Sequence, residues 1–239
     1  MMVGRKADGS LWGWGDSHFG AMAFNQGGSY KRSSPVQMTG SSNWSSNIAN
    51  DGGNMMMGVK NDGTLWTWGY NEKGQLGLNQ GPGNSTDSRS SPVQLPGTWS
   101  TGAQQSYSAN YSCGCINTDG ELWVWGSNSY AMLGQNNNVK YSSPVQLPGT
   151  TWRTVSGEGK WNVMATKTDG TLWAWGSNGS GQLGLNQSHN LRLSSPTQIG
   201  SDTTWKHIED GIYLSTAVKT DGTLWAWGYN GYGRLGHNN

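Results

Sequence analysis

The residues best suited to chemistry are few and scattered. Cys113 and Cys115 are separated by one residue, so in a strand they share a face and cannot easily bridge each other. A single Cys-x-Cys pair without further ligands is a weak metal signal, and we expect structural thiols. The histidines lie at unrelated places, which are His18, His189, His207 and His237. With no nucleophile elbow, phosphate loop or metal-ligand spacing beside them, we expect no enzyme, no metal and no cofactor.

Cationic residues have a more regular spacing. Variable loops at 21–32, 78–89, 135–141 and 185–193 each end close to a Ser-Ser-Pro sequence. The cations at these ends are Lys31 and Arg32, then Arg89, Lys140 and Arg192. They either satisfy nearby carbonyls or a strand edge, or they form a cationic rim for anionic sugars or a partner's acidic surface.

Aromatic residues outside the repeated motifs are the other binding candidates. Packing symmetry does not explain them, and aromatic faces stack on sugar rings. They are Phe19, Phe24, Tyr30, Tyr70, Tyr130, Tyr141, Tyr229 and Tyr232.

One sequence motif recurs along the whole chain. Asp-Gly-x-Leu-Trp-x-Trp-Gly begins at Asp8, Asp62, Asp119, Asp169 and Asp221, a period near fifty residues. Such a period is typical of a blade or solenoid unit that must stack on its neighbours to bury its apolar face. The composition agrees, because 38 glycines, 15 tryptophans and only 12% charged residues suit a turn-dense all-β fold.

Each unit is read as about four short strands. Asp-Gly between two strand-like runs indicates a tight hairpin, and the next strand alternates so that its two tryptophans share a face. Recurrence in every unit favours packing between blades over ligand binding. The expected structural core is Trp12, Trp14, Trp66, Trp68, Trp123, Trp125, Trp173, Trp175, Trp225 and Trp227.

These motifs resemble the regulator of chromosome condensation repeat family, and we expect the closest likeness to its bacterial and phage members. The matching elements are the x-Leu-Trp-x-Trp-Gly strand, the Asn-x-x-Gly-Gln-Leu-Gly turns at 71–77 and 178–184, and Ser-Ser-Pro-Val-Gln. The resemblance implies a β-propeller, which has seven blades when complete in this family. The family includes a GTPase exchange factor and a β-lactamase inhibitor, so it does not name the function. The absence of the family's Gly-x-x-His element and of an inserted wedge disfavours an exchange factor.

The domain organisation follows from the repeats. We expect a single domain over 1–239 with repeats near 9–62, 63–119, 120–169 and 170–221. Residues 222–239 and 1–8 then form a split fifth unit, with residues 3–7 pairing with the last hairpin to close a ring. The fold class is an all-β propeller of about five blades with almost no helix.

The function expected from these features is non-catalytic recognition or structure, as a phage virion or cell-surface component that binds protein or glycan through one rim. The alternatives are a secreted or cytosolic inhibitor or regulator that clamps a protein, and a soluble lectin. Partners could include virion proteins or copies of this chain. The net charge of +1 argues against nucleic acid, and no apolar run predicts a membrane span. No signal peptide is visible, and the expected location is virion or extracellular.

Overall fold

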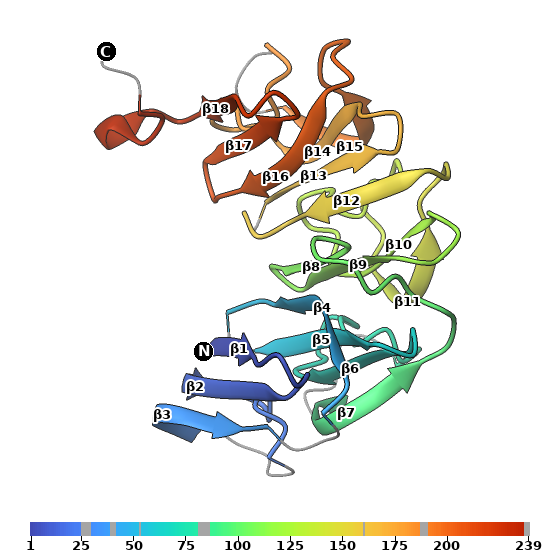
Figure 1. Cartoon of the computed structure of the whole chain (residues 1–239). Helices are drawn as coiled ribbons and strands as arrows, with labels where there is room; N and C mark the ends of the chain where they lie inside the picture. The colour runs from blue at the N-terminus through green and yellow to red at the C-terminus, as the bar shows by residue number, and fades with distance from the viewer. Residues whose placement is uncertain are drawn as a thin grey trace.

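The chain folds into five antiparallel sheets, called blades 1 to 5, that follow one another in chain order (Figure 1). This computed structural model describes residues 1–24, 30–38, 42–52, 54–80, 87–159, 161–186 and 191–236. Blades 2 to 4 have four strands each, and blades 1 and 5 have three. Among the described residues, helical structure is confined to short 3-10 turns such as η2 (Gly231–Gly233). The expected all-β fold of about five blades is confirmed.

The strands of each blade are neighbours in sequence as well as in space. Blade 1 contains β1 (Met2–Arg5), β2 (Leu11–Ser17) and β3 (Tyr30–Gln37). Blade 2 contains β4 (Trp44–Asn50), β5 (Met55–Lys60), β6 (Leu65–Gly69) and β7 (Arg89–Leu95). Blade 3 contains β8 (Ser106–Ala109), β9 (Ser112–Ile116), β10 (Leu122–Gly126) and β11 (Tyr141–Gln146). Blade 4 contains β12 (Trp152–Ser156), β13 (Asn162–Lys167), β14 (Leu172–Ser177) and β15 (Arg192–Gln198). Blade 5 contains β16 (Trp205–Asp210), β17 (Leu214–Lys219) and β18 (Leu224–Gly228).

The Asp-Gly phrase forms the hairpin turn within each blade. In blade 2, Gly63 has φ +80°, a conformation that only glycine adopts without strain. The carboxylate of Asp62 accepts hydrogen bonds from the backbone N–H (3.0 Å) and hydroxyl (2.6 Å) of Thr64. That hydroxyl oxygen in turn accepts the indole N–H of Trp66 at 2.9 Å. The motif therefore fixes both the turn and the first tryptophan after it.

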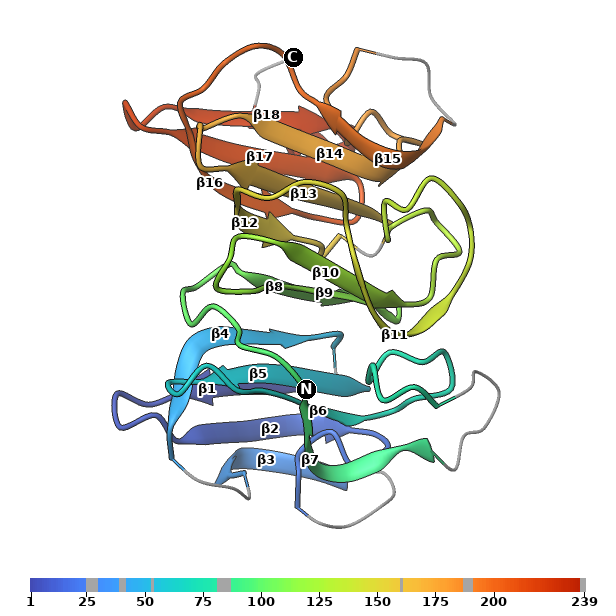
Figure 2. The same ribbon diagram turned by 90° about the vertical axis from the view of Figure 1, so that its right-hand side faces the viewer.

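The second tryptophan of the motif joins each blade to the preceding one. Its indole N–H donates to a backbone carbonyl in the glycine-rich turn of that blade, as from Trp68 to Ala21 (2.8 Å) and from Trp125 to Gln75 (2.9 Å). Trp175 of blade 4 repeats the contact with Met132 at 2.7 Å. Figure 2 shows the resulting stack of sheets edge on. Because the rings of Trp68, Trp125 and Trp175 are buried, they pack between blades.

The first tryptophan of each motif is only partly buried in blades 1 to 4, and Trp225 of blade 5 is 49% exposed. The core assignment is therefore wrong for Trp225. Blade 5 has no fourth strand among the described residues, so nothing equivalent to β7, β11 or β15 covers this side of β18. Leu224 is 70% exposed, whereas its counterpart Leu172 is fully buried.

The N-terminal strand does not close a ring. β1 pairs with β2, with Met2 opposite Trp14 and Arg5 opposite Leu11, and blades 1 and 5 lie at opposite ends of an open arc (Figure 1). The expected pairing of residues 3–7 with the last hairpin, and with it the split fifth unit, is wrong. A hairpin through the Asp8-Gly9 turn closes a short loop, which costs far less chain entropy than pairing the two ends of the chain.

Candidate interaction surface

One edge of the arc collects the ends of the strands that carry the Leu-Trp-x-Trp-Gly motif and the starts of the strands that follow them. Strand register places Arg89 opposite Gly69, Arg192 opposite Ser177, and Arg32 opposite Gly15. The Asp-Gly turns lie at the opposite edge, because they directly precede the same Leu-Trp-x-Trp-Gly strands. The two edges therefore present different residues of every repeat.

Aromatic rings follow this first edge from blade 1 to blade 5, and we call them the aromatic rim. Centroid distances are 4.2 Å for Phe19 and Tyr70, and 5.7 Å for Tyr70 and Tyr111. A second group continues through blades 3 to 5, with pair distances of 5.9, 5.2 and 6.2 Å. Its members, in order, are Tyr130, Trp161, Tyr213 and Tyr229.

Backbone strain marks two positions of the aromatic rim. Phe19 has φ +54° and Tyr111 has φ +66°, which bulky L-residues adopt at a cost of about 1–3 kcal/mol. Such conformations persist only where the surrounding structure holds them in place. Here they bring both rings into contact with Tyr70 between them.

The second aromatic group borders an open cavity of 290 Å³. Three rings line it together with small polar residues, and the lining is Tyr130, Trp161, Tyr213, Ser177, Gly179, Ser180 and Gln182. The guanidinium of Arg192 lies 5.1 Å from the centre of the Tyr130 ring and donates to the carbonyl of Ser129 at 3.1 Å. The cavity thus combines apolar faces with hydroxyl and amide groups and has one cation beside its Tyr130 wall, which is the usual make-up of a binding pocket.

A buried carboxylate holds the turn that carries Trp161. Asp210, at the end of β16, accepts hydrogen bonds from the Ser156 hydroxyl (2.5 Å) and from the backbone N–H groups of Glu158 (2.9 Å) and Gly159 (3.1 Å). A side chain on Gly159 would collide with the Gly211 carbonyl and the Asp210 carboxylate, so the two turns pack closely. Asp210 therefore fixes blade 4 against blade 5 beside the cavity.

Burial perturbs the carboxyl groups at this junction. Burial raises the pKa of Asp210 to about 7, although its hydrogen-bond donors favour the charged form. The pKa of Glu158 is also raised, mainly because its carboxyl group is half-buried and secondly because the charge of Glu209 repels its own. Gln104 of blade 3 donates to the Glu209 carboxylate at 2.8 Å and so extends the polar network across three blades.

The predicted rim cations lie on this edge, but their local contacts differ. Arg89 donates to the carbonyls of Asp87 (3.1 Å) and Ser88 (3.3 Å), as in the structural interpretation. Lys31 is exposed and 3.5 Å from Asp16, and Lys140 is exposed. Much of the predicted loops, at 25–29, 81–86 and 187–190, lies outside the described residues.

The predicted aromatic residues also differ in their local contacts. Phe24 lies 5.7 Å from the Arg32 guanidinium, and the Tyr141 hydroxyl accepts a hydrogen bond from Asn137 at 3.0 Å. Tyr232 is 94% exposed. The side chain of Tyr30 lies outside the described residues.

Sequence reasoning missed Tyr111, Trp161 and Tyr213, although they belong to the aromatic rim. All three lie in turns between the first and second strands of their blades. Trp161 and Tyr213 stand where the family's Gly-x-x-His element is altered in this chain. The sequence signal that could have identified Trp161 and Tyr213 is an aromatic residue at a position where the Gly-x-x-His element is altered.

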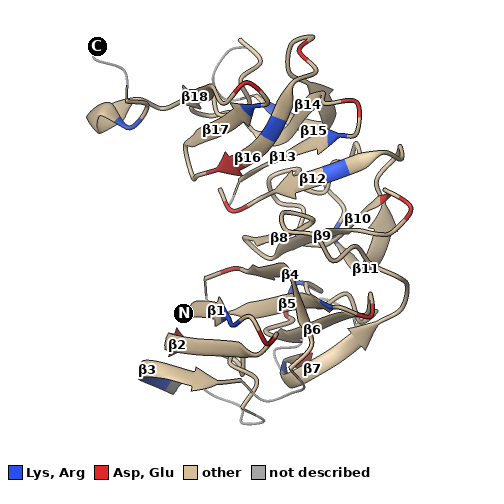
Figure 3. Ribbon diagram, in the orientation of Figure 1, with Lys and Arg blue, Asp and Glu red and all other residues tan. Residues whose placement is uncertain are grey.

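The two thiols are buried and free of disulfide bonds. Burial raises the pKa of the Cys113 thiol well above its ordinary value and that of Cys115 to about 12, so both remain protonated. Within the described residues, no group of three or more His, Cys, Asp or Glu side chains could hold a metal. In the same part of the chain, no helix has the length and apolarity needed to cross a membrane. Figure 3 shows that charges of both signs are interspersed over the blades.

A profile of the regulator of chromosome condensation (RCC1) repeat matches residues 62–116, 119–157 and 169–218, which is more than half of the chain. The chain belongs to this repeat family. Protein RCC2 of Homo sapiens is 31% identical over 230 residues, covering 96% of this chain and 38% of the relative. The ultraviolet-B receptor UVR8 of Arabidopsis thaliana is 26% identical, covering 95% of this chain and half of the receptor. The chain thus spans about two fifths of the length of the RCC2 relatives it matches.

Solved structures agree on the fold. Human WBSCR16 superposes with a TM-score of 0.78 over 95% of this chain and 58% of that one, at 15% identity. Prp20p of Saccharomyces cerevisiae also gives 0.78, over 99% of this chain and 58% of that one, at 16% identity. At such identities the likeness shows that this RCC1-repeat chain has their fold and nothing further.

These relatives correct two expectations. The matched RCC2 proteins come from human, mouse, frog and zebrafish, so the expected likeness to bacterial and phage members is not supported. The same kinship with animal proteins contradicts the expected virion or extracellular location.

Proposed function

We propose that this RCC1-repeat chain is a non-catalytic, protein-binding part of a regulator, and that the aromatic rim is its binding surface. The observation that carries the proposal is the cavity lined by Tyr130, Trp161 and Tyr213, with Arg192 stacked at its margin. Tyrosine, tryptophan and arginine are the residues that most often dominate the energetics of protein interfaces. This corresponds to the clamp that was an alternative from sequence, rather than to a virion component.

Known relatives support a protein partner. The Prp20p structure is described with binding properties to Gsp1p and histones, and a second structure contains Kap60 bound to the same yeast protein. The charge-poor composition and net charge of +1 also suit an interface that depends on aromatic anchors more than on long-range attraction.

Binding of Gsp1p, histones and Kap60 as probes tests the proposal. The Trp161→Ala/Tyr213→Ala double variant removes two anchors, and we expect at least about a tenfold loss of affinity in biolayer interferometry. Thr118→Ala, on the exposed Asp-Gly edge, is the matched control and should bind like the parent. Unchanged binding of a folded double variant would contradict the proposed surface.

A glycan ligand is the second candidate, because the same cavity sets aromatic faces beside Ser177, Ser180 and Gln182. This arrangement suits a pyranose ring, whose apolar face stacks while its hydroxyls form hydrogen bonds. A glycan array with the parent and the Trp161→Ala/Tyr213→Ala variant separates the candidates. Retention of a sugar by the parent alone would favour the lectin.

A further inference from the structure

A lysine begins the Asp-Gly turn in four of the five blades. The backbone N–H of each lysine donates to the carbonyl four residues later, at 2.9 to 3.1 Å. In blades 2, 4 and 5 the ammonium lies over two tryptophan rings, one from the first strand and one from the third. The distances to the ring centres are 5.4 and 4.2 Å for Lys60, 4.7 and 4.1 Å for Lys167, and 4.8 and 4.0 Å for Lys219.

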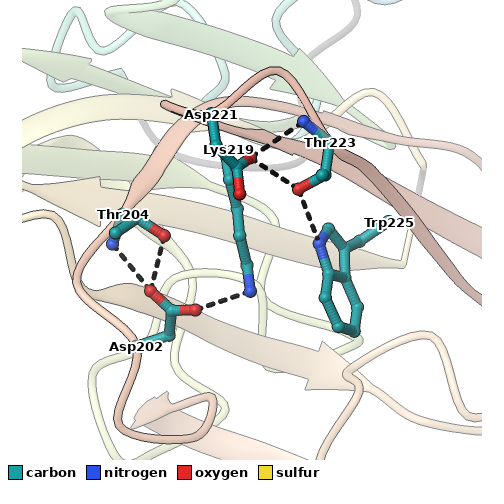
Figure 4. Close-up of polar contacts among 6 residues, drawn as sticks. All are labelled: Asp202, Thr204, Lys219, Asp221, Thr223 and Trp225. Carbon is teal, nitrogen blue, oxygen red and sulfur yellow. Dashed lines mark hydrogen bonds and ion pairs between the residues drawn. The ribbon is translucent and has the colours of Figure 1, made fainter.

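In blade 5, Figure 4 shows the Lys219 ammonium beside the Asp202 carboxylate and the Trp225 ring. Lys219 lies between Trp205 and Trp225, and its ammonium forms an ion pair with Asp202 at 2.6 Å. The indole N–H of Trp225 donates to the Thr223 hydroxyl at 3.2 Å, which fixes the ring. Two tryptophan faces and a nearby carboxylate therefore form a site for a primary ammonium.

Blade 3 has Asn117 at the position of the lysine. The correspondence is shown by the backbone, because the N–H of Asn117 donates to the carbonyl of Glu121 at 2.9 Å. The Asn117 side chain folds back onto its own turn, where it donates to the Glu121 carboxylate at 2.7 Å and accepts from the N–H of Asp119 at 3.0 Å. This blade supplies no ammonium of its own to the two tryptophans.

A cavity of 340 Å³ occupies the corresponding place between Trp99 and Trp123. Its other lining residues are Pro96, Gly97, Thr98, Asn117 and Pro144. The Trp99 indole N–H donates to the Pro96 carbonyl at 3.1 Å, and that of Trp123 donates to the Glu121 carboxylate at 3.2 Å. Both rings are therefore held in place by hydrogen bonds, so the cavity is preformed.

The charge of this turn complements a cation. Residues 117–121 contain two carboxylates, Asp119 and Glu121, and no cation. The equivalent turns at 60–64 and 167–171 contain one lysine and one aspartate. Blade 3 thus keeps the aromatic walls, gains a carboxylate and lacks the positive charge that the other blades place there.

We propose that the cavity between Trp99 and Trp123 is a binding site for the lysine side chain of a partner protein, seated as Lys60, Lys167 and Lys219 are seated in their own blades. The four-carbon stem contacts the prolines and ring faces, and the ammonium lies over both rings beside Glu121. The site is on the Asp-Gly edge, away from the aromatic rim, so it is independent of the proposed function.

n-Butylammonium, which reproduces the lysine stem and ammonium, tests the site. The indole N–H signals of Trp99 and Trp123, assigned by Trp→Phe replacement, are followed by NMR during titration of the full chain. We expect saturable shifts of both signals and binding about fivefold or more tighter than that of n-butanol, the neutral analogue. Equal affinity for the two probes, or no shift, would overturn the proposal.

Two exchanges between blades sharpen the test. Asn117→Lys should fill the cavity from within and weaken butylammonium binding at least about tenfold, whereas the control Thr118→Lys adds the same charge outside it and should change binding less than about threefold. Lys167→Asn should create a new site, seen as shifts of the Trp152 and Trp173 signals. Undiminished binding in folded Asn117→Lys, or no new site in folded Lys167→Asn, would refute the assignment.

Discussion

Trp175→Ala is the most direct test of how the blades are held together. The Trp175 side chain is fully buried, and its ring packs edge-on against Trp152 at 6.0 Å. Its indole N–H donates to the Met132 carbonyl of the preceding blade at 2.7 Å. The substitution therefore removes ring packing and a hydrogen bond across one blade boundary.

The expected loss of unfolding free energy is about 3–5 kcal/mol, as for other large aromatics truncated in a core. Because the melting temperature of a chain of this size changes by roughly 2–4 °C per kcal/mol, a fall of about 6–20 °C follows. Trp175→Phe retains most of the packing and removes one of the two donors to the Met132 carbonyl, which keeps the Tyr107 hydroxyl at 3.1 Å, so the expected loss is only about 0.5–1.5 kcal/mol.

Thermal and urea unfolding followed by circular dichroism measure both effects. Trp225→Ala is the control, because this tryptophan is the first of its motif and is 49% exposed, so its loss should lower stability much less. A melting temperature for Trp175→Ala within 2 °C of the parent, or an equal fall for Trp225→Ala, would refute packing between blades as the source of stability.

Three further predictions concern charge and backbone. The pKa of Asp210, raised to about 7 from an ordinary 3.8, makes the folded chain bind more protons than the unfolded chain between these values. Stability should therefore fall as pH rises from about 4 to 7, by up to about 1.4 kcal/mol per pH unit, and Asp210→Asn should flatten this slope in urea unfolding measured across that range. Gly170→Ala should be more destabilising than Gly222→Ala in thermal melts. Both glycines have positive φ, but only at Gly170 would a Cβ collide with the Thr203 carbonyl. Equal losses of stability would show that backbone strain is the whole effect. Arg192→Glu should elute from heparin at lower salt than the parent with a melting temperature within about 2 °C, whereas a large loss of stability would assign this cation to structure.

The strands and their hairpins could be predicted from the sequence, because the residues that specify each strand lie within its own repeat. The Asp-Gly turn, the alternation after it and the half-buried tryptophan depend on residues no more than a few positions apart, as Asp62, Thr64 and Trp66 show. The pairing expected between residues 3–7 and the last hairpin is wrong for the same reason. The Asp8-Gly9 turn lies next to β1 in the chain and pairs it with β2 instead.

The surfaces were decided by the tertiary structure. Tyr130, Trp161 and Tyr213 come from three blades, and no spacing in the chain shows that their rings meet around one cavity. The sequence shows that Asn117 stands where the other four repeats have a lysine. Only the stacked blades show what a lysine does at that position. Sequence periodicity specifies the contacts that every repeat makes with itself and its neighbour. A residue that departs from the period acquires its role from the side chains that the fold places around it.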